Sequence, residues 1–180
     1  MPEPESAPLR HPSPNHFRAD VPLRLLLLLA ALAGLLLVLT SKQTELIPFP
    51  FPPYAISHTA KWTHSPAFVY LVVALAAGCL YSVVTLVAAA TWSRPATLLF
   101  LLIISDAMMA GVLAAATGTG GAIGYLGVKG NSHVNWGKVC NVYGKFCRHI
   151  GSGVALALAA SVLLVTLVAL SSHSLYRRSR

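Results

Sequence analysis

Charged side chains are scarce in this chain, and acidic ones are the scarcest. The 180 residues include five Asp and Glu against 13 Lys and Arg, and charged residues make up 10% of the total. Soluble domains carry about 25% charged residues. The chain also lacks G-x-S-x-G and H-E-x-x-H patterns, so it offers no recognisable pair of nucleophile and base. These shortages argue against a soluble domain and against catalytic residues of any kind.

Apolar residues fill most of the chain instead, at 56% of the total with a mean hydropathy of +0.68. Nearly uncharged runs of about 20 residues are long enough to span a bilayer, and they must be helical there because hydrocarbon offers backbone groups no other partner. The sequence therefore predicts an all-α membrane protein, a bundle of four transmembrane helices within residues 21–171. The expected helices cover about residues 22–41, 66–90, 96–118 and 150–171, with outer loops at 42–65 and 119–149.

The first apolar run, residues 25–39, is the shortest and also fits the core of a signal peptide. No A-x-A-like cleavage site follows it, and its uncharged flanks make it long enough for a retained helix, which we favour. Residues 1–20 are rich in proline and poor in apolar groups, so they are expected to form a disordered cytoplasmic tail. Pro22 suits the first turn of the first helix, and residues 172–180 form a basic cytoplasmic tail.

The sidedness of the chain depends on weak but concordant signals. An even number of spans places both termini on the same side of the membrane. The basic sequence LYRRSR directly follows the fourth helix, which favours a cytoplasmic location. Cys140 and Cys147 share the second long loop and would pair in an oxidising exterior. We therefore expect both termini to be cytoplasmic.

Asp106 is the one acid inside the predicted spans, about ten residues into the third helix. A carboxylate at that depth costs about 2.5 to 3.5 kcal/mol, so it should face the bundle and find a partner. Arg24 is the one strong base inside a predicted helix, but helical side chains lean toward the N-terminus, which points Arg24 away from Asp106. A direct pair requires a tilt or an offset of the first helix. The alternatives are protonation of Asp106 or a hydroxyl partner on a neighbouring helix, such as Tyr81, Ser82, Thr85, Ser161 or Thr166.

The intramembrane charges allow two functional interpretations. A transport path normally shows several ionisable or helix-breaking residues near the midplane. A single acid therefore favours a structural pair, Arg24 and Asp106, that links the first and third helices. A small transporter or channel that uses Asp106 is the alternative.

Small residues recur at four-residue spacing on two of the predicted helices. Such faces allow close packing of helices in lipid. The third helix carries Ala107, Gly111 and Ala115, and the fourth carries Gly153, Ala157 and Ser161. Packing within one chain is the simpler interpretation of these faces, and packing between chains, which means oligomerisation, is the more specific one.

The second long loop contains two cysteines seven residues apart. On one straight helix they would be about 10 Å apart in rise alone, beyond the roughly 7 Å limit for a disulfide. A Cys140–Cys147 disulfide, which we expect, therefore needs a bend, and Gly144 is suited to supply it. A zinc site that adds His133 and His149 lacks the paired spacing of structural zinc sites.

A glycine-rich run, TGTGGAIGYLG at residues 117–127, invites comparison with a dinucleotide-binding loop. It fails the G-x-G-x-x-G pattern because Ile123 stands at the third glycine, and no strand precedes it. We expect these glycines to loosen the end of the third helix.

Several stretches together resemble one plant family. RLLLLLAALAGLLLVLTSKQT from Arg24, the acid in the third helix, YLGVKGNSHVNWGKVCNVYGKFC from Tyr125 and the tail SLYRR resemble the CASP-like (Casparian strip membrane domain protein-like) proteins, related to MARVEL tetraspans. The resemblance covers about residues 24–178, and group one fits best. TSKQT, GNSHVNW and the C-x6-C loop are its most specific parts. The first loop departs from the strip-forming members, since ELIPFPFPP keeps only Glu45, Pro48 and Phe49 of their signature.

The resemblance implies a multi-pass plasma-membrane protein that forms homo-oligomers and hetero-oligomers with related members. It also implies that Arg24 and Asp106 are the family's characteristic helix-one Arg and helix-three Asp. We therefore expect a non-enzymatic scaffold that organises membrane subdomains, with membrane lipids and recruited cell-wall enzymes as further partners. The net charge of +8 is explained by anionic lipid, so no nucleic acid, cofactor or metal is expected.

Overall fold

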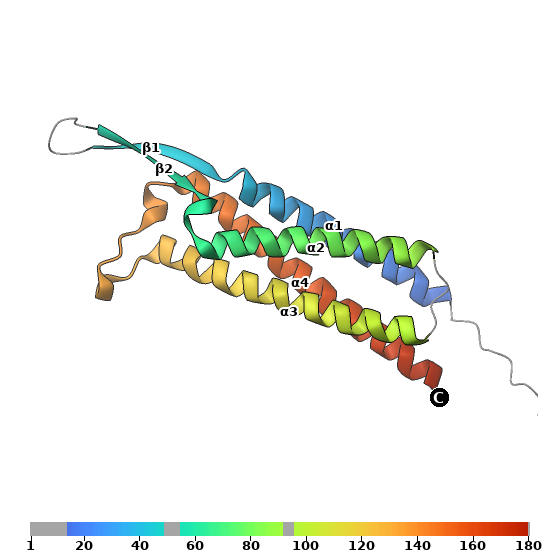
Figure 1. Ribbon diagram of the computed structural model, residues 1–180. Coiled ribbons are helices and arrows are strands. Elements are labelled where there is room, and N and C mark those ends of the chain that lie inside the picture. Colours follow the sequence, from blue (N-terminus) through green and yellow to red (C-terminus); the bar gives the residue numbers. More distant parts are fainter. Residues whose placement is uncertain (1–13, 49–54, 92–95, 180) are drawn as a thin grey trace, which may run out of the picture.

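The computed structural model describes residues 14–48, 55–91 and 96–179. Four long helices dominate this part of the chain, and successive helices run in opposite directions along the bundle (Figure 1). They are α1 (Pro14–Leu39), α2 (Pro66–Thr91), α3 (Ala96–Lys129) and α4 (Gly144–Ser179). Each contains a stretch long and apolar enough to cross a membrane. The expected all-α, four-span fold is confirmed.

The four helices pack in a ring. The main contacts join α1 to α2, α2 to α3, α3 to α4 and α4 to α1, so α1 and α3 lie diagonally across the bundle from each other. Each helix contributes a fully buried leucine to the core: Leu27, Leu71, Leu113 and Leu164. Other leucines, such as Leu29 and Leu80, are more than half exposed, as expected for a surface that contacts lipid.

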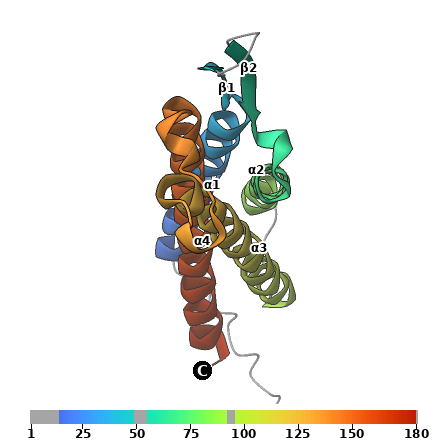
Figure 2. The same cartoon turned by 90° about the vertical axis from the view of Figure 1, so that its left-hand side faces the viewer.

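The two ends of the bundle differ in structure. One end, called here the hairpin end, carries the strands and the connection from α3 to α4 (Figure 1). Figure 2, in which this end faces the viewer, shows the hairpin above α1 and α2, with the connecting segment in front of α3 and α4. At the other end, called the terminal end, α1 begins and α4 finishes (Figure 1).

A β-hairpin occupies much of the loop between α1 and α2. Strands β1 (Lys42–Pro48) and β2 (Ala55–Lys61) are antiparallel, and the hydroxyls of Thr44 and Thr59 lie 2.9 Å apart across the pair. The short 3-10 helix η1 (Trp62–His64) then leads into α2. The sequence analysis did not predict this hairpin, although its β-branched Thr and Ile residues are typical of strands.

The connection between α3 and α4 is a compact loop with two short 3-10 helices, η2 (Ser132–Val134) and η3 (Val139–Asn141). Asn131 and Trp136 exchange two backbone hydrogen bonds of 3.0 and 2.9 Å. Gly130 has a φ of 67°, and a Cβ there would lie 2.6 Å from the Trp136 carbonyl oxygen. Only glycine fits this turn without strain.

At the terminal end, α1 is longer than the sequence predicted. It begins at Pro14 instead of residue 22, so residues 14–20 of the expected disordered tail are helical; residues 1–13 lie outside the described residues. Pro22 therefore lies two turns inside α1, not in its first turn. The added turns include Asp20, which is buried and bonded to Arg24. This intrahelical pair supplies the stabilisation that composition alone did not reveal.

α3 and α4 also exceed their predicted lengths, both of them at the hairpin end and α4 at the terminal end as well. α3 continues through the glycine-rich run to Lys129 instead of ending at residue 118. α4 begins at Gly144 instead of residue 150, and it continues to Ser179 instead of residue 171. Phe146 and Ile150, four residues apart, are both buried, so the start of α4 is amphipathic and packs as a helix.

Candidate functional site

The most polar buried feature of the bundle is a group of side chains near its terminal half, called here the charged cluster: Asp20, Arg24, Tyr81, Ser105 and Asp106. Arg24 and Asp106 are each the eleventh residue from the terminal end of α1 and α3, and Tyr81 holds the same place in α2. At 1.5 Å per residue, these three lie about 15 Å from that end. Three helices therefore place their polar groups at one depth.

Arg24 lies at the centre of the charged cluster and is only 1% exposed. Its Nη1 and Nη2 donate to the two carboxylate oxygens of Asp106, at 3.2 and 2.9 Å. Its Nε donates to Asp20, at 3.2 and 3.3 Å from the two oxygens. A fork-shaped, two-bond contact of this kind is the strongest arrangement between arginine and a carboxylate.

Asp106 is fully buried and accepts hydrogen bonds from two other helices. Besides Arg24 of α1, the hydroxyl of Tyr81 on α2 donates to Asp106 Oδ1 at 2.5 Å. The same hydroxyl lies 3.0 Å from Ser105 Oγ. Because α1 and α3 are diagonal neighbours, the Arg24–Asp106 pair crosses the centre of the bundle, and Tyr81 links α2 to it.

The Arg24–Asp106 contact removes the obstacle that the sequence analysis raised. Because helical side chains lean toward the N-terminus, the sequence analysis required an offset of the first helix for this contact. α1 extends further at the terminal end than predicted, and Arg24 therefore lies at the depth of Asp106. Of the hydroxyl residues considered as partners of Asp106, Tyr81 is the one that bonds to it. The others bond to backbone carbonyls: Ser82 to Gly78, Thr85 to Tyr81 and Ser82, Ser161 to Ala110, and Thr166 to Val162.

Sequence reasoning missed Asp20, because it was assigned to the tail. An acid four residues before Arg24 is a recognisable helical pair, and this spacing was the available signal. In lipid no water is present to accept from a guanidinium, and two carboxylates accept from more of the Arg24 N–H groups than a single carboxylate would. Removing Arg24 from this group leaves two buried carboxylates without their cation, at a cost of about 3 to 5 kcal/mol.

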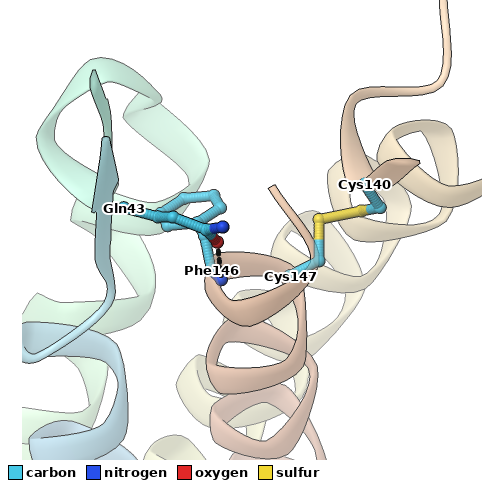
Figure 3. Close-up of a disulfide and its surroundings, with 4 residues drawn as sticks. All are labelled: Gln43, Cys140, Phe146 and Cys147. Atoms are coloured by element: carbon cyan, nitrogen blue, oxygen red, sulfur yellow. Dashed lines mark hydrogen bonds between the residues drawn. A yellow bond between two sulfur atoms is a disulfide. The ribbon is translucent and has the colours of Figure 1, made fainter. Parts of the chain in front are cut away.

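A Cys140–Cys147 disulfide closes the hairpin end, with the two Cα atoms 5.7 Å apart. Cys140 belongs to η3 and Cys147 to α4, so the chain turns between them near Gly144, as the expected bend required. Figure 3 shows the disulfide beside Phe146, whose backbone N–H donates to Gln43 Oε1 at 2.8 Å. Both sulfurs are used in the disulfide, which leaves no thiolate for the zinc site considered above.

The hairpin is attached to the helices by a few polar contacts. The Gln43–Phe146 bond joins β1 to α4, and the Tyr143 hydroxyl donates to the His58 carbonyl of β2 at 3.3 Å. The rings of Phe68 and Phe146 pack edge to face, with centroids 6.0 Å apart. These contacts connect the hairpin, the disulfide loop and α2 at one place.

The two small-residue faces have different environments. On α4, Gly153, Ala157 and Ser161 are buried, and a Cβ on Gly153 would overlap the Val38 side chain of α1. On α3, Ala107, Gly111 and Ala115 are exposed, and a Cβ on Gly111 would meet nothing within 4 Å. One face packs inside the chain, and the other is uncovered.

Comparison with known proteins gives a consistent result. The family model of the Casparian strip membrane protein domain matches residues 14–163. A CASP-like protein 1D1 of Musa acuminata is 59% identical over 177 residues, which cover 94% of this chain and 92% of the relative. Proteins of the same name from Oryza sativa subsp. japonica and Arabidopsis thaliana are 49% and 47% identical, over 90% and 89% of this chain and 82% and 85% of the relatives. No solved structure matches significantly.

Proposed function

Because this chain belongs to the CASP-like protein family of multi-pass membrane proteins, in its group one, we propose that it is a non-enzymatic scaffold that self-associates in the plasma membrane. Copies of the chain, and of related members, pack side by side and define a membrane subdomain. Cell-wall enzymes are the proposed recruits, and lipids are the surrounding partners.

The observation that carries this proposal is the uncovered face of α3. Ala107, Gly111 and Ala115 form a strip of small residues that no other part of the described chain covers. In lipid, small residues at four-residue spacing allow two helices to approach closely. The same spacing on α4 already supports close packing inside this chain, where Gly153 lies against α1. A second copy is the natural partner for the α3 face.

The charged cluster supports a structural role over transport. Asp106 is fully buried, and its carboxylate oxygens bond to Arg24 and Tyr81 inside the bundle. An acid that carries ions or protons normally faces a pathway together with other polar groups. Here the acid instead joins three helices, so its proposed role is to fix the bundle that presents the α3 face.

The proposed sidedness places the hairpin end outside the cell and the terminal end in the cytoplasm. The Cys140–Cys147 disulfide is suited to an oxidising exterior, and the basic end of α4 is suited to the cytoplasmic surface. Cell-wall enzymes would then meet the hairpin and the disulfide loop. Reaction of Lys61 or Lys138, both exposed, with a membrane-impermeant amine reagent on intact cells tests this orientation.

Self-association is tested by energy transfer between two labelled copies of the full chain in one bilayer. Gly111→Leu fills the α3 face without an internal clash, and Ala159→Leu places the same side chain at an exposed position of α4. We expect Gly111→Leu to lower self-association at least fivefold and Ala159→Leu to leave it unchanged. Equal association of both variants and the native chain would refute the assigned interface.

A further inference from the structure

A cavity of about 710 Å³ lies at the hairpin end, between the last turns of α3, the loop that contains η3 and the start of α4, and Phe68 of α2 also lines it. Its lining is almost entirely apolar, and Lys129 and Asn135 are among its few polar members. Ligand sites are typically concave, 300 to 1,000 Å³ in volume, and apolar with a few polar groups. The cavity has the size and character of such a site.

Glycines keep this cavity open. Gly121, Gly124 and Gly127 follow one another at three-residue spacing on α3 and line the cavity, and Gly151 lines it from α4. A Cβ on Gly124 or Gly151 would meet nothing within 4 Å. Glycine weakens a helix by about 1 kcal/mol relative to alanine, so three in one wall need a reason. At Gly124 the empty volume supplies it, since a larger side chain would fill the space, whereas a Cβ on Gly121 or Gly127 would lie 3.7 Å from Val154 or 3.3 Å from the Cys140 sulfur.

The depth of the cavity makes an empty apolar wall unfavourable. α3 has 34 residues and is therefore about 51 Å long, whereas a bilayer with its headgroups is about 40 to 45 Å thick. The glycine-lined part of α3 begins 25 residues from the terminal end, or about 38 Å along the helix. It thus lies at headgroup level, where water would contact the apolar wall unless a molecule covered it.

The charge around the cavity indicates which kind of molecule it would bind. Residues 119–149 contain four Lys and Arg and no Asp or Glu. Lys129 lines the cavity, and Lys138, Lys145 and Arg148 of the same segment are exposed. An apolar chamber with an exposed lysine in its lining, in a segment of one charge sign, is complementary to an apolar chain that ends in an anion.

We propose that this cavity binds one long-chain fatty acid. The alkyl chain lies between the glycine walls of α3 and α4, and the carboxylate contacts Lys129. Cys140 and Cys147 both line the cavity, so the disulfide fixes its η3 wall to α4. This site is separate from the charged cluster and from the α3 face proposed for self-association.

Native mass spectrometry of the detergent-solubilised full chain with added stearate tests the proposal. We expect one bound stearate per chain. Gly124→Leu should weaken stearate binding at least tenfold, and Gly111→Leu, an equally open glycine of α3 away from the cavity, should not. Gly151→Leu fills the cavity from α4 and tests the same volume independently. Absence of a stearate adduct, or equal stearate binding by the Gly124→Leu, Gly151→Leu and Gly111→Leu variants, would overturn the site.

The role of charge is tested with the uncharged analogue, stearyl alcohol. Lys129→Gln should weaken binding of stearate at least fivefold while leaving stearyl alcohol binding unchanged. Lys145→Gln, which removes a lysine of the same segment outside the cavity lining, should change neither. Equal weakening of both probes by Lys129→Gln would show that the site does not select an anion.

Discussion

The two halves of the bundle are held together by different chemistry. In the terminal half, polar side chains from three helices meet, and Arg24 of α1 connects Asp20 of the same helix to Asp106 of α3. At the hairpin end, the connections are a backbone-paired hairpin, a disulfide and single hydrogen bonds such as the Gln43–Phe146 bond. The charged contacts are buried, whereas most of the hairpin residues that the structure describes are exposed.

This difference follows from the solvent at each depth. Inside hydrocarbon, a charged group has no water and must be satisfied by other side chains, so a single buried acid requires several partners. At the hairpin end, water and headgroups solvate exposed polar groups, so strands and irregular loops are tolerated. The bundle is therefore expected to be sensitive to small chemical changes in the terminal half and to covalent changes at the hairpin end.

The largest expected effect is the loss of the central cation. Arg24→Met keeps the length of the side chain but leaves Asp20 and Asp106 without it. We expect the free energy of unfolding in a detergent–lipid mixture to fall by about 3 to 5 kcal/mol, the range for a broken buried ion pair. Leu25→Met, at the next and partly exposed position of α1, should change the stability by much less. Similar stability of the two variants would contradict the claim that buried charges hold the terminal half of the bundle together.

Loss of the disulfide is expected to have a smaller and local effect. Replacing Cys140 and Cys147 together with serine removes a cross-link that closes a short loop, which is worth about 2 to 3 kcal/mol. Hydrogen exchange should increase in η3 and the first turns of α4 and stay unchanged around Asp106. Increased exchange near Asp106 would instead show that the two halves of the bundle are strongly coupled.

The smallest expected change in stability comes from adding a methyl group to the small-residue face of α4, and the same change on the face of α3 is the comparison. Gly153→Ala introduces a Cβ that overlaps Val38, and overpacking of this kind costs about 1 to 3 kcal/mol. Gly111→Ala, in open space, should leave the stability of the single chain unchanged or slightly raised, because alanine favours a helix. Thermal unfolding of both variants measures the difference. Equal destabilisation would mean that the α3 face is also packed within one chain.

Composition was sufficient to predict the four spans, because a bilayer demands long apolar helices whatever their details. The ends of those helices were harder to predict. Residues 14–20 looked disordered because their stabilising contact, Asp20 to Arg24, depends on an arginine that the sequence analysis related only to Asp106. The glycine run was expected to end α3, but tertiary packing overrides propensity there, since Gly120 lies against Val154 and Leu71.

The site residues were recognisable as types but not as an arrangement. An acid in a span signals a partner, and Arg24 was the available base, yet their contact depends on equal depth in α1 and α3. That depth follows from helix ends that local sequence does not specify. Tyr81 was one of several hydroxyl residues that could equally have been the partner of Asp106. The sequence does not specify which helices are neighbours in the bundle, because that is a tertiary property. Likewise, spacing alone did not distinguish the buried face of α4 from the uncovered face of α3.

The most direct test of the proposed structural role of the charged cluster is a double-mutant cycle on Arg24 and Asp106. The stabilities of the native chain, Arg24→Met, Asp106→Leu and the double variant are measured by unfolding in one detergent–lipid mixture. If the pair links α1 to α3, the double variant will be more stable than the sum of the single losses predicts, by at least about 2 kcal/mol, because each single variant already loses the whole Arg24–Asp106 contact and the sum counts that loss twice. Additive losses, or a fully stable Asp106→Leu variant, would contradict a structural role for this pair.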